Sequence, residues 1–200
     1  MEPLPRSFYD RDTPLVARDL LGAHLVRTLP GPGRRQLIGR IVETEAYLGP
    51  ADAASHARAG RTARTEVMFG PLGHAYVYFT YGMHWMLNVV ARRNEPAGAV
   101  LLRSVEPLAG LESMRQRRTG LPDKELTNGP AKLCQALAVT GALNGLDLCD
   151  AAGPLYVAPR SPPSDPLVAI GSRIGIRNVS EPWRSLPLRF WIEHNRFVSR

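Results

Sequence analysis

The chain has 200 residues, 44% of them hydrophobic, and a formal net charge of +7. This length predicts one sizeable core in a single domain spanning residues 1–200, and the positive charge predicts an anionic partner, with nucleic acid favoured. No apolar run approaches membrane-spanning length and the opening MEPLPRSFYDRD lacks a signal-peptide pattern, so we expect a cytoplasmic protein without a membrane partner.

The first predicted elements are a short helix and a hairpin. Asp12 and Pro14 are typical of a helix start, and Gly22 ends the apolar run that follows. A strand is predicted at residues 23–28 and another at 36–47, with the turn sequence PGPGRR between them. The two strands should pair in an antiparallel hairpin.

The second of these strands contains the unusual sequence GRIVETEAY. With a period of two, Glu43, Glu45 and Tyr47 share one face, so two carboxylates and an aromatic ring project together near the strand end. A carboxylate beside an aromatic ring, with His56 shortly downstream, can act as a general base next to a flat ligand. The alternative is an exposed edge strand with solvated glutamates.

A basic loop follows this strand. Asp52 is predicted to cap a short helical turn that carries His56, and three arginines come next: Arg58, Arg61 and Arg64. These arginines form either a solvated basic surface or, beside a site that binds nucleobases, contacts to a phosphate backbone.

The sequence HAYVYFTYGMHWMLNVVA predicts two buried strands joined by a tight turn at Tyr81 and Gly82. Tyr81 therefore lies at a hairpin tip, where it either reaches out or packs against the end of the sheet. Tyr78 lies on the first arm, and Asn88 lies among apolar residues of the second, where its amide needs a hydrogen-bond partner.

The rest of the chain completes an α+β fold. A buried strand ends near Arg103, a helix is predicted at residues 106–118, and Thr127–Pro130 opens another helix, which ends at Gly141. The remaining predicted segments are a proline-rich loop at 158–166 and three strands at 172–177, 188–192 and 197–199. The predicted fold is a single domain in which helices flank a curved, mostly antiparallel sheet with a protruding β-hairpin.

With these segments in order, the chain resembles the alkyladenine DNA glycosylase family, the 3-methyladenine DNA glycosylases of the mammalian type that also occur in bacteria. The matching segments extend over nearly the whole chain: RDTPLVARDLLG, GRIVETEAYLGPADAASHA, VYFTYGMHWMLNVV, VLLRSVEPL, LTNGPAKLCQAL, PLRFWI and NRFVSR. The resemblance implies an enzyme of base-excision repair that flips alkylated or deaminated purines out of duplex DNA and hydrolyses the N-glycosidic bond. The lesion class includes 3-methyladenine, 7-methylguanine, hypoxanthine and ethenoadenine.

The resemblance also implies roles for individual residues. Glu45 would activate the water and Arg103 would hold it, as the catalytic pair. Damaged purines would be bound by Tyr47, Tyr78, His56 and Asn88, with Asn88 crowding the 2-amino group of guanine. DNA would be contacted by Tyr81, which fills the vacated stack, and by Met83, His84, Arg61 and Lys132. We expect a monomer that acts on double-stranded DNA in the bacterial nucleoid.

The five histidines and two cysteines lack metal-ligand spacing, so no metal site or other cofactor is expected. The only lysines are Lys124 and Lys132, and neither is a good candidate to attack a sugar, which predicts a monofunctional enzyme. Two rival interpretations are a non-catalytic nucleic-acid-binding module, with surface glutamates, and a glycoside hydrolase that uses Glu43 and Glu45 as a carboxylate pair.

Overall fold

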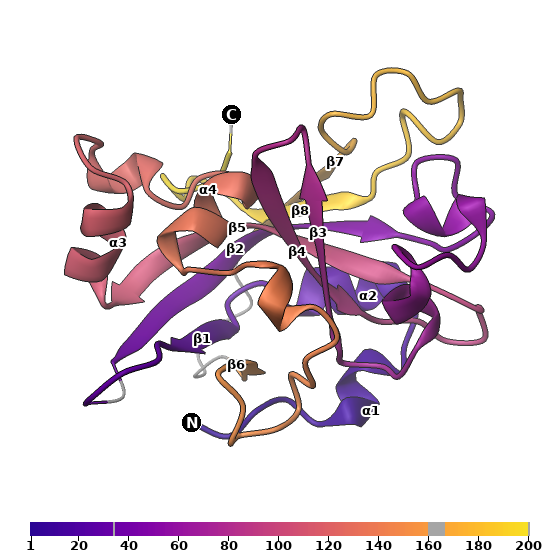
Figure 1. Ribbon diagram of the computed structural model, residues 1–200. Helices are drawn as coiled ribbons and strands as arrows, with labels where there is room; N and C mark the ends of the chain where they lie inside the picture. Colours follow the sequence, from indigo (N-terminus) through magenta and orange to yellow (C-terminus); the bar gives the residue numbers. More distant parts are fainter. Residues whose placement is uncertain (34, 160–166, 200) are drawn as a thin grey trace.

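The computed structural model describes residues 1–33, 35–159 and 167–199, and one curled antiparallel sheet dominates it (Figure 1). Eight strands are present in this part of the chain: β1 (His24–Thr28), β2 (Gln36–Tyr47), β3 (Ala75–Thr80), β4 (His84–Val90), β5 (Ala99–Ala109), β6 (Leu155–Ala158), β7 (Val168–Gly171) and β8 (Arg189–Ile192). The main path through the sheet is β3-β4-β5-β2-β1-β6, with β8 also paired to β2 and β7 to β8. The α+β class and the antiparallel sheet predicted from the sequence are confirmed.

Strand β2 lies in the interior of the sheet. It pairs with β5 on one side, and on the other it pairs first with β1 and then with β8, where Glu43 lies opposite Trp191 and Glu45 opposite Arg189. Glu43 and Glu45 are completely buried. The alternative of an exposed edge strand is therefore wrong.

Four short α-helices and four 3₁₀ turns accompany the sheet in the described residues: α1 (Arg6–Tyr9), α2 (Thr13–Asp19), α3 (Leu111–Arg117), α4 (Pro130–Ala136), η1 (His56–Ala59), η2 (Glu66–Phe69), η3 (Asp123–Glu125) and η4 (Gly141–Leu143). Helix α2 packs against β2, β5 and β8, while α4 packs against β4 and β5. The Thr44 hydroxyl donates to the Ala17 carbonyl of α2, at 2.7 Å. Because side chains alternate along a strand, Glu43 and Glu45 project to the face away from α2.

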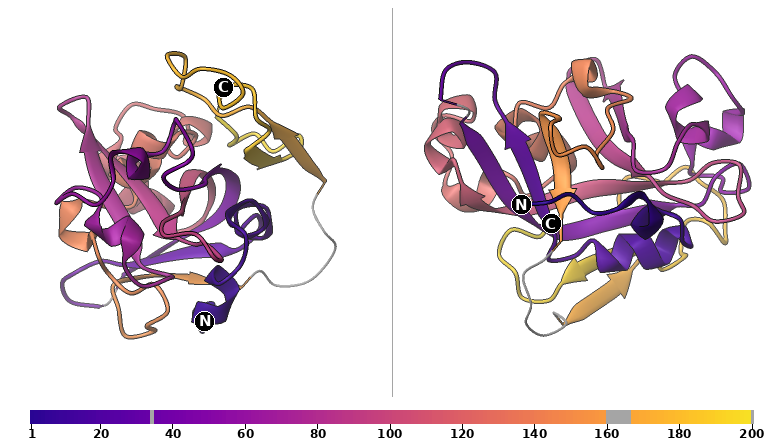
Figure 2. Two further views of the ribbon diagram at one scale, coloured as in Figure 1. Left: turned by 90° about the vertical axis from the view of Figure 1, so that its right-hand side faces the viewer. Right: turned by 90° about the horizontal axis from the view of Figure 1, so that it is seen from below.

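Strands β3 and β4 form a hairpin that rises from the sheet (Figures 1 and 2). Its tip is the turn at residues 81–83, where Tyr81 has φ 52° and Gly82 has φ 68°. A glycine relieves the cost of this left-handed backbone. Tyr81 is 79% exposed and does not pack against the end of the sheet, so the alternative that buried it there is wrong.

Two predicted helix boundaries are wrong, one because of strand pairing and one because of backbone conformation. Residues 106–109, predicted as helix, continue β5, since Glu106 pairs with Arg40 of β2, and α3 begins only at Leu111. Helix α4 ends at Ala136, well before Gly141, because Ala138 has a positive φ.

The C-terminal predictions differ from the structure in three further places. Residues 172–177 form an irregular loop. The strand in this region is β7, which lies before the loop and ends at Gly171. Residues 197–199 are also irregular. Most of the loop predicted at 158–166 lies outside the described residues.

Candidate active site

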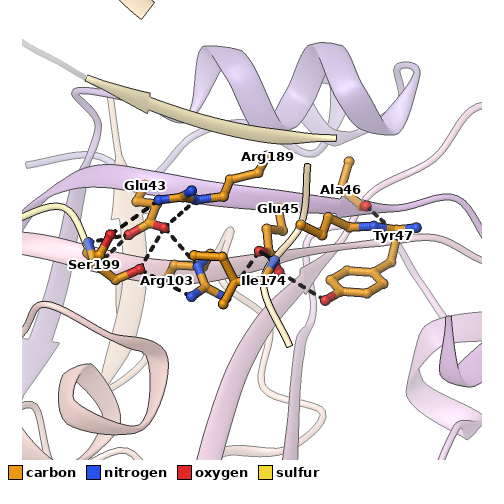
Figure 3. Close-up of polar contacts among 10 residues, drawn as sticks. Glu43, Glu45, Ala46, Tyr47, Arg103, Ile174, Arg189 and Ser199 are labelled. Atoms are coloured by element: carbon orange, nitrogen blue, oxygen red, sulfur yellow. Dashed lines mark hydrogen bonds and ion pairs between the residues drawn. The ribbon is translucent and has the colours of Figure 1, made fainter. Parts of the chain in front are cut away.

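The candidate active site contains Glu45, held by donors from three parts of the chain (Figure 3). One carboxylate oxygen, Oε1, accepts the backbone N–H of Ile174 at 2.7 Å and lies 3.1 Å from Nη1 of Arg103. The other oxygen, Oε2, accepts the Tyr47 hydroxyl at 2.9 Å. Glu45 thus keeps acceptor capacity, because a carboxylate has about four lone-pair positions.

Glu43 is held by a larger set of donors. Its Oε1 accepts Nε of Arg103 at 2.9 Å, Nε of Arg189 at 2.7 Å and the Ser199 hydroxyl at 2.8 Å. Its Oε2 accepts the Ser104 hydroxyl and the Ser199 backbone N–H, both at 2.8 Å. Five donors saturate this carboxylate, which gives it a structural role.

These surroundings shift the two carboxyl pKa values in opposite directions. Burial raises the pKa of Glu45 above its ordinary value, and the pull of Arg103, Ile174 N–H and the Tyr47 hydroxyl only partly offsets it. Burial also acts on Glu43, but Arg103, Ser199 and Arg189 together bring the pKa of Glu43 below its ordinary value. Of the pair, Glu45 is the carboxylate suited to accept a proton.

A cavity of about 370 Å³ opens beside Glu45. Three of its lining residues, Tyr47, Arg103 and Ile174, contact the Glu45 carboxylate. The cavity also brings together all four residues expected to bind substrate, and the hairpin residue Tyr81 reaches it: Tyr47, His56, Tyr78, Asn88 and Tyr81. These side chains come from β2, η1 and the β3–β4 hairpin.

Aromatic rings form one wall of this cavity. The His56 and Tyr78 ring centroids are 4.6 Å apart, and Tyr78 lies 5.3 Å from Tyr76. His56 Nδ1 lies 3.0 Å from the Tyr76 hydroxyl. Burial, with a smaller contribution from Arg64, lowers the pKa of His56, so its imidazole is neutral at neutral pH. The wall suits a flat ligand.

Asn88 has the hydrogen-bond partner that its burial requires. Its amide Nδ2 donates to the backbone carbonyl of Tyr76 across the hairpin, at 3.1 Å. This bond fixes the side chain at the cavity wall.

The remaining predicted DNA contacts lie outside the cavity lining. Met83 and His84 are exposed at or beside the hairpin tip. Arg61 is exposed and pairs with Glu66 at 2.7 Å, and Lys132 Nζ donates to Asn128 Oδ1 at 2.9 Å. Helix α4 reaches the cavity only through Pro130.

The loop at residues 172–177 belongs to the site, although the sequence predicted a strand there. Besides the Ile174 N–H bond to Glu45, the side of this loop formed by Ile174, Gly175 and Ile176 lines the cavity. The alternating sequence SRIGIR is typical of a strand, so periodicity gave the wrong answer. The glycine inside it was the available sign of irregular backbone.

Asp52 also differs from the prediction. Ser55, rather than Asp52, caps η1. Asp52 is fully buried and binds the guanidinium of Arg173, with Oδ1 2.9 Å from Nη2. The loop at 172–177 is thereby attached to the strand end beyond Tyr47.

The described residues contain no group of three or more His, Cys, Asp or Glu side chains placed to hold a metal ion. Within the same residues, no helix is both long and apolar enough to cross a membrane.

Comparison with known proteins gives consistent matches over nearly the full length. The family model described as methylpurine-DNA glycosylase matches residues 7–196. A protein of Carboxydothermus hydrogenoformans, named "Putative 3-methyladenine DNA glycosylase", is 47% identical over 98% of both chains. Proteins with the same name are 50% identical in Methanocella arvoryzae, over 92% of both chains, and 45% identical in Myxococcus xanthus, over 100% of this chain and 95% of the relative.

Proposed function

The chain belongs to the methylpurine-DNA glycosylase family and is a DNA glycosylase of base-excision repair. From this premise we propose that it flips alkylated or deaminated purines out of duplex DNA into the cavity beside Glu45. There it hydrolyses the N-glycosidic bond with an activated water and leaves an abasic site. The observation that carries the proposal is the Glu45 carboxylate beside the aromatic cavity. It is buried, its pKa is raised, and it keeps acceptor capacity.

In the proposed reaction, the water oxygen forms a bond to C1′ of the sugar while the C1′–N9 bond breaks. The electron pair of the broken bond leaves with the purine, and Glu45 takes the proton of the water. Oε2 is the oxygen suited to this task, because its one protein partner is a hydroxyl that can rotate. Arg103 orients the water and keeps Glu45 ionised. The carboxylate also stabilises positive charge developing on the sugar.

The purine would lie against the rings of Tyr47 and Tyr78, with His56 at its edge. This placement is supported by the lining of the cavity and by the neutral, hydrogen-bonded imidazole of His56. Asn88, fixed by its bond to Tyr76, would crowd the 2-amino group of guanine and so favour adenine-like purines.

The hairpin tip would enter the DNA. Tyr81 is exposed and also borders the cavity, so it can occupy the stack that a flipped nucleotide leaves. Met83 and His84 would contact the groove beside it, and Arg61 and Lys132 would contact phosphates. Arg61 would exchange its exposed pair with Glu66 for a phosphate, a small cost for a solvated ion pair. We further propose that one copy of the chain suffices, as a monomer.

The proposed chemistry makes the enzyme monofunctional, with water rather than a lysine as nucleophile. A glycoside hydrolase using Glu43 and Glu45 as a pair is disfavoured because five donors saturate Glu43. A set of duplex oligonucleotides, each with one lesion of the proposed class, tests the function directly. Release of free purine and appearance of alkali-labile abasic strands are expected, and intact strands for every lesion would overturn the proposal.

A further inference from the structure

The two tyrosines proposed to stack on the flipped purine each carry an arginine on their ring. The Arg173 guanidinium carbon lies 4.8 Å from the centroid of Tyr47, and that of Arg64 lies 5.2 Å from the centroid of Tyr78. Both tyrosines line the cavity beside Glu45, whereas neither arginine does. The arginines therefore contact these rings from outside the cavity lining.

The two arginines differ in how their charge is balanced. Arg173 is buried and forms an ion pair with the buried carboxylate of Asp52, which largely neutralises it. Arg64 is exposed and has no ion pair with a carboxylate in the part of the chain that the structure describes. It lines a separate surface hollow with Arg58 and Thr62, and His56 borders both this hollow and the cavity. Arg64 is thus the uncompensated charge at the aromatic wall.

A purine's charge decides how well it stacks on such a wall. The negative face of an aromatic ring attracts a cation, but an arginine on one face draws the ring's electron density toward itself. The ring is then a poorer partner for a second cation, and the two cations also repel each other. Methylation at N7 of guanine or N3 of adenine makes the purine of the nucleotide cationic, whereas hypoxanthine and ethenoadenine are neutral.

We propose that Arg64, acting through Tyr78, is a selectivity residue that favours neutral over cationic purine lesions. This inference rests on the proposed function, because it requires the purine to stack on Tyr78. It assigns Arg64 no part in breaking the bond. Removing its charge should therefore raise the excision rate of cationic lesions relative to neutral ones. A variant that only disturbed the local structure would slow the excision of all lesions equally.

The test compares two lesions in one sequence context, 7-methylguanine and hypoxanthine, for the wild-type chain, Arg64→Gln and Arg64→Lys. Subsaturating single-turnover rates are measured, with spontaneous loss of 7-methylguanine subtracted. Arg64→Gln should raise the ratio of 7-methylguanine to hypoxanthine excision about two- to fivefold, the rate equivalent of an exposed cation–π contact of about 0.5–1 kcal/mol. Arg64→Lys, which keeps the charge, should stay near the wild-type ratio.

An unchanged ratio in Arg64→Gln, including an equal slowing of both lesions, would overturn the inference. An equal shift in Arg64→Lys and Arg64→Gln would overturn it as well, because charge would not be the cause. These outcomes differ from failure of the proposed function, in which the wild-type chain would excise neither lesion.

Discussion

Glu43 and Glu45 bond the same guanidinium, that of Arg103, from positions two residues apart on β2. The first is saturated by five donors, whereas the second has three, from Tyr47, Arg103 and Ile174, and keeps acceptor capacity. The two carboxylates of one ion-pair network therefore differ in their surroundings, and in the proposed reaction Glu43 holds Arg103 in place while Glu45 accepts the proton.

Glu45→Gln should keep the fold and the binding of lesion DNA but reduce excision by a factor of about 10² or more, because a neutral amide cannot accept the water proton. Single-turnover rates on a hypoxanthine duplex, with binding measured separately, check this expectation. Near-normal rates in the variant would remove Glu45 from the mechanism.

The free energy of unfolding should depend on Glu43 more than on Glu45, whereas excision should depend more on Glu45. The pKa of Glu43 is lowered in the fold, so its ionised form stabilises the fold above the unfolded pKa, and this contribution is lost as pH falls through the folded pKa. Glu43→Gln should cost about 3 kcal/mol at neutral pH by breaking a buried ion pair. The pKa of Glu45 is raised, so its charge opposes folding at neutral pH, and Glu45→Gln should leave stability unchanged or increased. Urea unfolding of both variants measures the difference, and equal losses would contradict it.

The excision rate should rise with pH through the pKa of Glu45. Burial raises this pKa, so the acid limb should lie above the range of an exposed glutamate. The proton acceptor must be ionised, which gives a low rate below the pKa and a plateau above it. A single-turnover pH profile on 7-methylguanine is the measurement, since this lesion leaves as a neutral purine and needs no acid. A limb at the position of an ordinary exposed carboxyl would contradict the burial argument.

Tyr81→Ala should weaken capture of the flipped purine about fivefold or more, because losing a stacked ring costs about 1–3 kcal/mol. The exposed position of Tyr81 means that the change should not affect stability. Leu108→Ala serves as the control, since Leu108 is also half or more exposed but lies on β5, away from the hairpin tip. Unchanged lesion binding and excision in Tyr81→Ala would show that the Tyr81 side chain has no role in binding lesion DNA.

The contrast between β2 and the loop at 172–177 shows how far sequence reasoning extends. Periodicity gave the bounds of β2 and the shared face of Glu43 and Glu45, although it could not give the register shifts between β2 and β5 on either side of Glu43. It could not give the five donors to Glu43, since Arg189 and Ser199 reach it only through tertiary folding. Periodicity predicted a strand at 172–177 because apolar side chains alternate there. In the structure those side chains line a cavity, and the backbone of the loop does not pair with the sheet.

The last prediction concerns the nucleophile. A glycosylase that also cleaves the strand uses an amine to attack the sugar and forms a Schiff base. The chain has two side-chain amines, Lys124 and Lys132. Lys124 is exposed in η3, whereas Lys132 on α4 donates from Nζ to Asn128 Oδ1 at 2.9 Å. Neither lysine lines the cavity beside Glu45.

Water should therefore be the nucleophile, and the product should be an intact abasic strand. Borohydride added during turnover should trap no covalent protein–DNA adduct, as judged by denaturing electrophoresis against a lysine-dependent glycosylase run in parallel. A trapped adduct would show that an amine attacks the sugar. Its disappearance in Lys132→Ala, but not in Lys124→Ala, would then identify the residue, because of the two lysines only Lys132 lies on the helix that borders the cavity.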